Sequence, residues 1–265
     1  MCAGILCGKS FPYYHDPQNE SDINPSDFPC GVAPDVTLVV CKVTSGASKT
    51  ASSFAVAHAL RCIKQSEDVD VVCLTMGSLG FSFDVVSAID ELIHNGVIVV
   101  CAASNYCHQF SQPICFPARL GHVLCIGSHG PHGKPSSFSP IGQEIDFLAP
   151  GENVAAPNST FIANHVAVDS GTSYAASAVA GLVCLILQYI SSLGDKFGTE
   201  IVKQFKNHWV MKEILRKMST CPGRHTDDEG FGALNPLQFF QRPDHIIQMI
   251  HDEVINPAFT ELSQE

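Results

Sequence analysis

Short apolar runs, separated by stretches with helical spacing, constrain the fold of this 265-residue chain more than any other feature. Because the runs are apolar along their length instead of at alternate positions, they predict strands that are buried on both faces of a sheet. Amphipathic helices are predicted between them at 52–65 and 83–96, and Asn95-Gly96 ends the second. The predicted strands are VTLVVCKV (36–43), VDVVCLTM (69–76), VIVVCAAS (97–104), VLCIGS (123–128) and EIDFLAP (144–150).

This alternation of strands and helices predicts an α/β fold with three layers, in which a mostly parallel sheet has helices on both faces. In such sheets the reactive groups gather at the carboxyl ends of the strands. Two loops follow buried strands at comparable positions, MGSLG at 76–80 and AASN at 102–105. A functional site is therefore expected at these loops.

The second half of the chain is predicted to be mainly helical. One helix begins near Ser173 and another spans 200–218, before a turn-rich stretch that leads to GFGALNPLQFF at 230–240. From Arg242 the tail is polar with short apolar patches, which predicts a peripheral helix or partial disorder.

Charge and composition restrict the classes of binding partner and the cellular compartment. The net charge of −11 argues against nucleic acid or an anionic membrane, which both favour clustered Lys and Arg. No segment has the length and uninterrupted apolarity of a membrane span, and no export signal begins the chain. Several of the 12 cysteines, Cys41 and Cys101 among them, lie inside apolar runs, which favours free thiols and an intracellular, reducing compartment.

Ser173 lies where small polar residues give way to an apolar helix, in DSGTSYAASAVAGLVCLIL (169–187). A helix N-terminus has unpaired N–H groups and partial positive charge, so a hydroxyl held there is well placed to act as a nucleophile. The same position suits an ordinary helix-capping serine. The segment alone leaves both interpretations open.

The order of further motifs favours the nucleophile. GTSYAASAVAG resembles the nucleophile motif of the subtilisin-like serine proteases, Gly-Thr-Ser-Met-Ala-Ala-Pro-x-x-Ala-Gly, with Tyr174 in place of Met and Ser177 in place of Pro. The similarity runs in order from residue 1 to about 240, so a subtilisin-like domain is expected at 1–241 and a C-terminal tail at 242–265. Other segments similar to the family are MCAGIL (1–6), GVAPDVTLVVCKV (31–43), LTMGSLG (74–80), VVCAASN (99–105) and SSFSPIGQEIDFLAPG (136–151).

The resemblance implies a serine endopeptidase that hydrolyses peptide bonds through an acyl-enzyme on Ser173. Asn105 would donate its side-chain N–H to the oxyanion, together with the Ser173 backbone N–H. Ser78, Leu79 and Gly80 would form a strand edge that pairs with an extended peptide substrate. The plainer alternatives are a turn asparagine at Asn105 and a simple strand exit at residues 78–80.

The proton-transfer half of such a site is not visible in the sequence. The resemblance puts the catalytic His three residues before Met1 and the Asp further upstream, so the chain is expected to lack the N-terminal strand and the helix start of the fold. It is then a fragment with little activity, or else a non-catalytic module that binds a peptide or a partner. Loss of a central strand should leave apolar surface uncovered. Asp169-Ser170-Gly171 and His129 to His132 spell the acid and base motifs, but in the wrong structural context.

No cofactor is expected. The cysteines and histidines between Cys107 and His129 include no Cys-x-x-Cys or His-x-x-x-His pair of the kind that binds zinc. Calcium is compatible with the resemblance, but no loop of spaced carboxylates is visible. The expected partner is a peptide or protein substrate.

Overall fold

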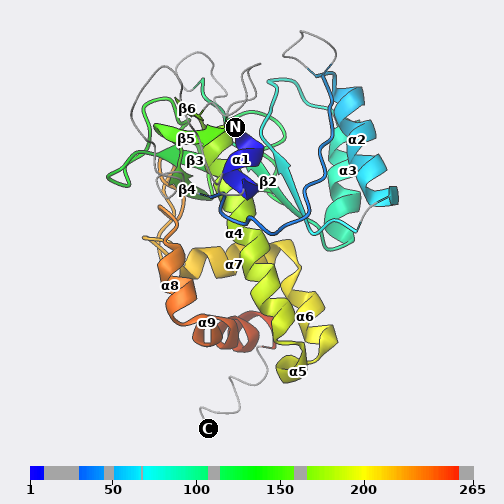
Figure 1. Cartoon of the computed structure of the whole chain (residues 1–265), viewed down its shortest axis with the longest axis vertical. Helices are drawn as coiled ribbons and strands as arrows, with labels where there is room; N and C mark the ends of the chain where they lie inside the picture. Colours follow the sequence, from blue (N-terminus) through cyan, green and yellow to red (C-terminus); the bar gives the residue numbers. More distant parts are fainter. Residues whose placement is uncertain (9–29, 45–50, 67, 107–113, 158–165, 257–265) are drawn as a thin grey trace, which may run out of the picture.

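The computed structural model describes residues 1–8, 30–44, 51–66, 68–106, 114–157 and 166–256 (Figure 1). Four parallel strands form the main sheet in the order β1-β2-β3-β4, and β5 pairs with β6 in a small antiparallel sheet. The register pairs Val71 with Ile98 and Val100 with Leu124, so the carboxyl ends of neighbouring strands lie at one edge. The strands are β1 (Val71–Leu74), β2 (Ile98–Ala102), β3 (Leu124–His129), β4 (Phe147–Pro150), β5 (Val154–Pro157) and β6 (Val166–Asp169).

Helices cover both faces of the main sheet, as the sequence predicts (Figure 1). On one face, α2 (Ser53–Ser66) and α3 (Phe83–His94) pack against strand residues such as Val99 and Cys125. On the other face, the long helix α4 (Thr172–Ser192) packs against Ile98, Val100 and Ile126, and α1 (Cys2–Cys7) packs against α4. Successive strand residues thus enter opposite cores, which explains why these strands are apolar throughout.

The C-terminal part is helical, with one correction to the sequence prediction. The helix predicted at 200–218 is two helices, because Asn207 has extended dihedral angles and its side chain accepts a hydrogen bond of 2.8 Å from the Trp209 N–H. This cap begins a new helix there. The helices are α5 (Gly194–Phe197), α6 (Thr199–Phe205), α7 (His208–Lys217), α8 (Pro236–Gln241) and α9 (Pro243–Ile250), followed by a π-helical turn at His251–Ile255.

Helix α9 belongs to the same core as α4. Its Ile246, Ile247 and Ile250 are buried in the cluster that contains the α4 side chains. The helix predicted after Arg242 is therefore present, and its apolar side chains are part of this core. The domain boundary at 241 stays a prediction.

The strand predicted at 36–43 is wrong. These residues are described but form no strand, Val40 is 74% exposed, and Cys41 is exposed. An apolar run becomes a strand only where a neighbouring strand supplies hydrogen bonds. Within the described residues β1 pairs only with β2, and no strand lies between β1 and the 36–43 segment.

Helix α4 corrects the prediction that no segment is long and apolar enough to cross a membrane. Its 21 residues, with a mean hydropathy of 1.7, meet that requirement by length and composition. In the structure it is the central helix of the larger core, with Ala176, Val183 and Ile186 fully buried. Burial inside the protein accounts for its composition.

Candidate active site

Ser173 is the second residue of α4 and points its side chain at the sheet. Its hydroxyl donates a 2.9 Å hydrogen bond to the Thr75 carbonyl, immediately after β1. The N-cap of α4 is Gly171, which has no side chain with which to cap the helix. The helix-capping interpretation of Ser173 is therefore wrong. The serine hydroxyl lies at the edge of the sheet where the strands end.

Asn105 follows β2 and contacts the same helix start. Its side-chain oxygen accepts hydrogen bonds from the backbone N–H and the hydroxyl of Thr172, at 2.8 and 2.9 Å. These two bonds fix the amide so that its NH₂ group faces away from Thr172. A Cβ added to Gly171 would lie 3.1 Å from that nitrogen, so glycine lets the amide approach the helix start. Asn105 and Ser173 thus lie on the same side of the sheet, and Thr172 connects them.

Two N–H donors at this point have no partner within the described residues. The Thr172 N–H is held by Asn105, and the Tyr174 N–H bonds to the Gly171 carbonyl at 3.1 Å. The intervening Ser173 N–H belongs to the first turn of a helix, where N–H groups have no intrahelical acceptor. The side-chain NH₂ of Asn105 is the second donor. Together with the helix N-terminus, these donors make a place that favours negative charge.

The segment from Ser78 to Gly80 uses most of its backbone groups internally. Ser78 forms an antiparallel bridge with Phe116, with N–H to O distances of 2.8 Å in both directions. The Leu79 carbonyl accepts from Arg119 and the Gly80 carbonyl accepts from the Ser78 hydroxyl. The N–H groups of Leu79 and Gly80 have no hydrogen-bond partner within the described part of the chain. This segment therefore has fewer free backbone groups than an unpaired strand edge.

The acidic and basic side chains near these motifs serve other contacts. Asp169 accepts a 2.6 Å hydrogen bond from the Tyr174 hydroxyl, which lowers the pKa of the Asp169 carboxyl. The ring Nδ1 of His129, at the end of β3, is 2.7 Å from the Gly130 carbonyl. Within the described residues, the Ser173 hydroxyl forms no hydrogen bond with a titratable side chain. No cluster of three His, Cys, Asp or Glu side chains occurs in the part of the chain that the structure describes; Cys107 and His108 lie outside it.

The structure adds positioning residues that the sequence reasoning did not single out. Thr172 orients the Asn105 amide, and Thr75 holds the Ser173 hydroxyl. Ser177, in place of the motif's proline, donates a 2.8 Å hydrogen bond to the Ser173 carbonyl and so tightens the first turn of α4. Thr172 is part of the Gly-Thr-Ser motif, so the motif could have pointed to a role for this residue. Nothing in the sequence marks Thr75.

Fold and contacts define an α/β domain with a serine hydroxyl and free amide donors at the carboxyl edge of a parallel sheet. The family model described as the subtilase family matches residues 2–233. The chain therefore belongs to the subtilase family, as the resemblance implies.

Relatives and solved structures agree with this assignment. The chain is 30% identical over 161 residues to the major intracellular serine protease of Bacillus subtilis (strain 168), with 60% of this chain and 49% of that protein covered. It is 32% identical to subtilisin Savinase of Lederbergia lenta over 205 residues, covering 77% of this chain and 68% of the relative. The chain spans about half the length of the Bacillus subtilis relative and 58% of the length of subtilisin DY of Bacillus licheniformis.

The solved structures share the fold. The self-cleaved protease domain of PatA matches with a TM-score of 0.68 and 20% identity, over 91% of this chain and 80% of that one. A cold-adapted subtilisin-like serine proteinase matches with a TM-score of 0.60 and 24% identity, over 77% of this chain and 67% of the other. At this level of identity the likeness concerns the fold alone.

Proposed function

We propose that this chain carries the nucleophile and oxyanion half of a serine peptidase site. Ser173 would attack the peptide carbonyl, and the Asn105 side-chain NH₂ and the Ser173 backbone N–H would stabilise the oxyanion that forms. The observation that carries the proposal is the pair of hydrogen bonds from Thr172 to Asn105, because they turn the amide donors outward beside the serine. The N–H groups of Leu79 and Gly80 would hold the backbone of an extended substrate.

The contacts of Ser173 also support a low rate for the chain as it stands. A serine hydroxyl attacks efficiently only when a base takes its proton. The Thr75 carbonyl accepts the hydroxyl hydrogen at 2.9 Å but is too weakly basic to remove it. After loss of a triad, proteases still accelerate hydrolysis by about 10³–10⁴-fold over water, through the oxyanion hole and substrate binding. We expect a residual acceleration of that order for this chain.

A fluorophosphonate probe tests the proposal through the pH dependence of its reaction with Ser173. Without a base, the labelling rate should rise about tenfold per pH unit between pH 7 and 9, because hydroxide must remove the proton. A histidine base would instead give a plateau above its pKa, near 6.5 for an ordinary imidazole. Peptide mapping locates the label. Ser173→Ala should abolish it, and Ser191→Ala, at an exposed serine near the far end of α4, is the matched serine control and should leave it unchanged.

The oxyanion assignment is tested by Asn105→Leu, which preserves volume and removes the donors. Labelling of Ser173 and residual peptide hydrolysis should both fall about 10²–10³-fold, the typical cost of one oxyanion donor. Thermal unfolding of the variant controls for the lost bonds to Thr172. Equal labelling rates in the variant and the parent would contradict the oxyanion role.

The second candidate is a non-catalytic module that binds a peptide or a partner. It is favoured by the absence of a titratable contact to the Ser173 hydroxyl among the described residues. This alternative predicts peptide binding without hydrolysis, and binding that survives Ser173→Ala and Asn105→Leu unchanged. Saturable binding measured by fluorescence anisotropy, with no cleavage after days of incubation, would support it over the peptidase.

A further inference from the structure

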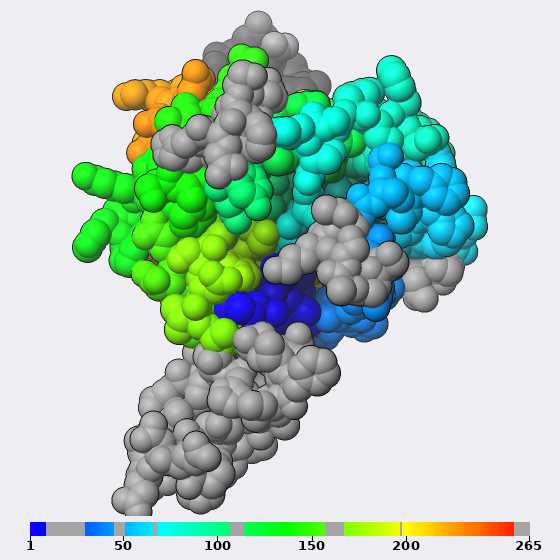
Figure 2. Space-filling view, turned by 90° about the horizontal axis from the view of Figure 1, so that it is seen from above, coloured from blue at the N-terminus to red at the C-terminus, as the bar shows by residue number. Residues whose placement is uncertain are grey.

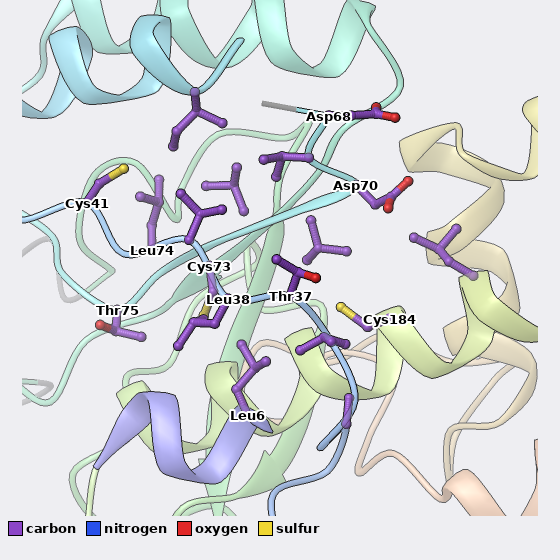
Figure 3. A pocket seen from close by; sticks show the side chains of 18 of the residues that line it. Leu6, Thr37, Leu38, Cys41, Asp68, Asp70, Cys73, Leu74, Thr75 and Cys184 are labelled. Atoms are coloured by element: carbon purple, nitrogen blue, oxygen red, sulfur yellow. The ribbon is translucent and has the colours of Figure 1, made fainter. Parts of the chain in front are cut away.

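The main sheet divides the surroundings of Ser173 into two sides. Ser78 is bridged to Phe116, and Phe116 is buried in the core that faces α2 and α3. Figure 3, a view into the pocket beside β1, shows Thr75 at the end of β1, with α2 and α3 on one face of the sheet and α1 and α4 on the other. Because the Ser173 hydroxyl bonds to the Thr75 carbonyl, the serine lies at the boundary between the two sides.

Tyr174, the residue after Ser173, belongs to the side of α1 and α4. These two helices pack against each other, and α1 also contacts β5; Figure 2 shows α1 in blue beside the yellow-green residues of β6 and α4. The Tyr174 hydroxyl lies 3.7 Å from the Met1 sulfur at the start of α1 and donates a 2.6 Å hydrogen bond to Asp169 in β6. The 78–80 segment and the Tyr174–Asp169 pair therefore lie on opposite sides of the nucleophile.

An extended substrate must pass the nucleophile from one side to the other. In the proposed function, the residues before the cleaved bond pair with the 78–80 segment, and the carbonyl oxygen of that bond faces the N–H donors of Asn105 and Ser173. The residues after the cleaved bond, which leave with the amine, then extend towards Tyr174 and Asp169. These two side chains are thus the groups that the leaving part of a substrate meets first.

The Asp169 carboxylate is exposed and is held in a fixed orientation. One oxygen accepts the Tyr174 hydroxyl, and the other accepts a 2.8 Å hydrogen bond from the Ser170 N–H. Both bonds favour the ionised carboxyl and lower its pKa. Asp169 forms no ion pair with a cationic side chain of the described residues, so its negative charge is available to a ligand.

We propose that the Tyr174–Asp169 pair determines specificity by favouring substrates with a basic residue immediately after the cleaved bond. The proposal rests on the proposed function, because it needs an acyl group on Ser173 and a leaving amine. The half-buried Tyr174 ring offers a surface to the apolar stem of a long basic side chain, whose charged head reaches the carboxylate. Arginine is favoured over lysine, since a guanidinium pairs with both carboxylate oxygens at once.

The test measures transfer of an acyl group from Ser173 to an amine. p-Nitrophenyl acetate acetylates the serine and releases p-nitrophenol, and the excess reagent is then removed. An added amino acid amide attacks the ester carbonyl: a C–N bond forms, the bond from the carbonyl carbon to the serine oxygen breaks, and an amine proton passes to that oxygen. Because this step is the reverse of acylation by a peptide, its rate reports the preference for the residue after the cleaved bond. Mass spectrometry of the peptide that carries Ser173 follows the loss of acetyl.

The two amines are argininamide and citrullinamide, its neutral analogue of nearly the same shape, at equal concentration. Argininamide should remove the acetyl group about fivefold faster at low ionic strength, the upper range for an exposed ion pair. In 1 M NaCl the ratio of the two rates should fall towards one, because the screening length shrinks to about 3 Å.

Three variants locate the effect. Asp169→Asn should abolish the preference for argininamide. Tyr174→Phe keeps the ring but frees the carboxylate, so the ratio should fall to about two. Asp195→Asn, at an exposed carboxylate on α5 beyond the far end of α4, makes the same change in net charge and should keep the full ratio. Circular dichroism verifies that the variants fold, and if Asp169→Asn does not, Tyr174→Phe and the salt dependence decide.

Equal rates for the two amides in the parent would overturn this proposal and leave the proposed function intact. So would an equal fall of the ratio in Asp169→Asn and Asp195→Asn, since the net charge of the chain would then be the cause. If the parent carries no more acetyl group in the 169–187 segment than Ser173→Ala does, the proposed function fails and this proposal fails with it.

Discussion

His208 makes the stability of this chain depend on pH. Its ring is 2% exposed at the start of α7, and both ring nitrogens lack a hydrogen-bond partner within the described residues. Burial, with Lys212 and His122 nearby, lowers the pKa of His208 to about 4. The helix N-terminus adds to the cost of a positive charge there. The folded protein therefore keeps this imidazole neutral at a pH where the unfolded chain protonates it.

The sign and size of the effect follow from this difference. Stability contributed by neutral His208 is fully present above the ordinary imidazole pKa of 6.5 and is lost as the pH falls towards 4. At about 1.4 kcal/mol per pH unit, the free energy of unfolding should decrease by about 3 kcal/mol over that interval. That is a large share of the total stability of a domain.

Urea unfolding followed by far-UV circular dichroism at pH 7, 6, 5 and 4 measures the effect. His208→Leu replaces the titrating ring with an apolar side chain. The free energy of unfolding of this variant should therefore fall by about 3 kcal/mol less than that of the parent over the same pH range. His245→Leu, at an exposed histidine on α9, is the matched control and should follow the parent. Parallel curves for the parent and His208→Leu would refute the reasoning.

Three further predictions each concern a single contact. Lys212 pairs with the buried Asp146, whose pKa burial raises, so Lys212→Met should cost about 3–5 kcal/mol in urea unfolding at pH 7. The loss should be smaller at pH 5, because removal of the ammonium raises the pKa of this carboxyl further and so favours its neutral form as the pH falls. An undiminished loss at pH 5 would contradict this. Gly230 has a φ of 60°, and a Cβ there would collide with the Asp146 carbonyl, so Gly230→Ala should lower the free energy of unfolding by about 3 kcal/mol. Tyr174→Phe removes the main cause that lowers the pKa of Asp169, so NMR titration should find that pKa raised; an unchanged value would assign the effect to the Ser170 N–H.

The apolar runs predicted β1 to β4 correctly because burial on both faces leaves a signal within each run. The 36–43 segment has the same signal, yet it is not a strand, since pairing depends on a neighbour that the run itself does not specify. The break between α6 and α7 was missed for a different reason. Asn207 continues a helical pattern in sequence, but its side chain satisfies the Trp209 N–H and begins a new helix.

The proximity of Ser173 and Asn105 was predictable from the order of the motifs, and the structure places both at the start of α4. The bonds that orient them were not predictable. The Asn105 side chain bonds to Thr172 across 67 residues, and the Ser173 hydroxyl bonds to Thr75 across 98. Such contacts depend on how distant segments pack and on the rotamers that result, and no local pattern records either.

Thr75 has a consequence that reaches beyond positioning. Thr75 follows the last residue of β1, and its carbonyl accepts the hydrogen bond of the Ser173 hydroxyl. A substitution that shifts the end of β1 therefore moves this acceptor, even if it touches neither Ser173 nor Asn105. The orientation of the Ser173 hydroxyl is in this way tied to the packing of the sheet.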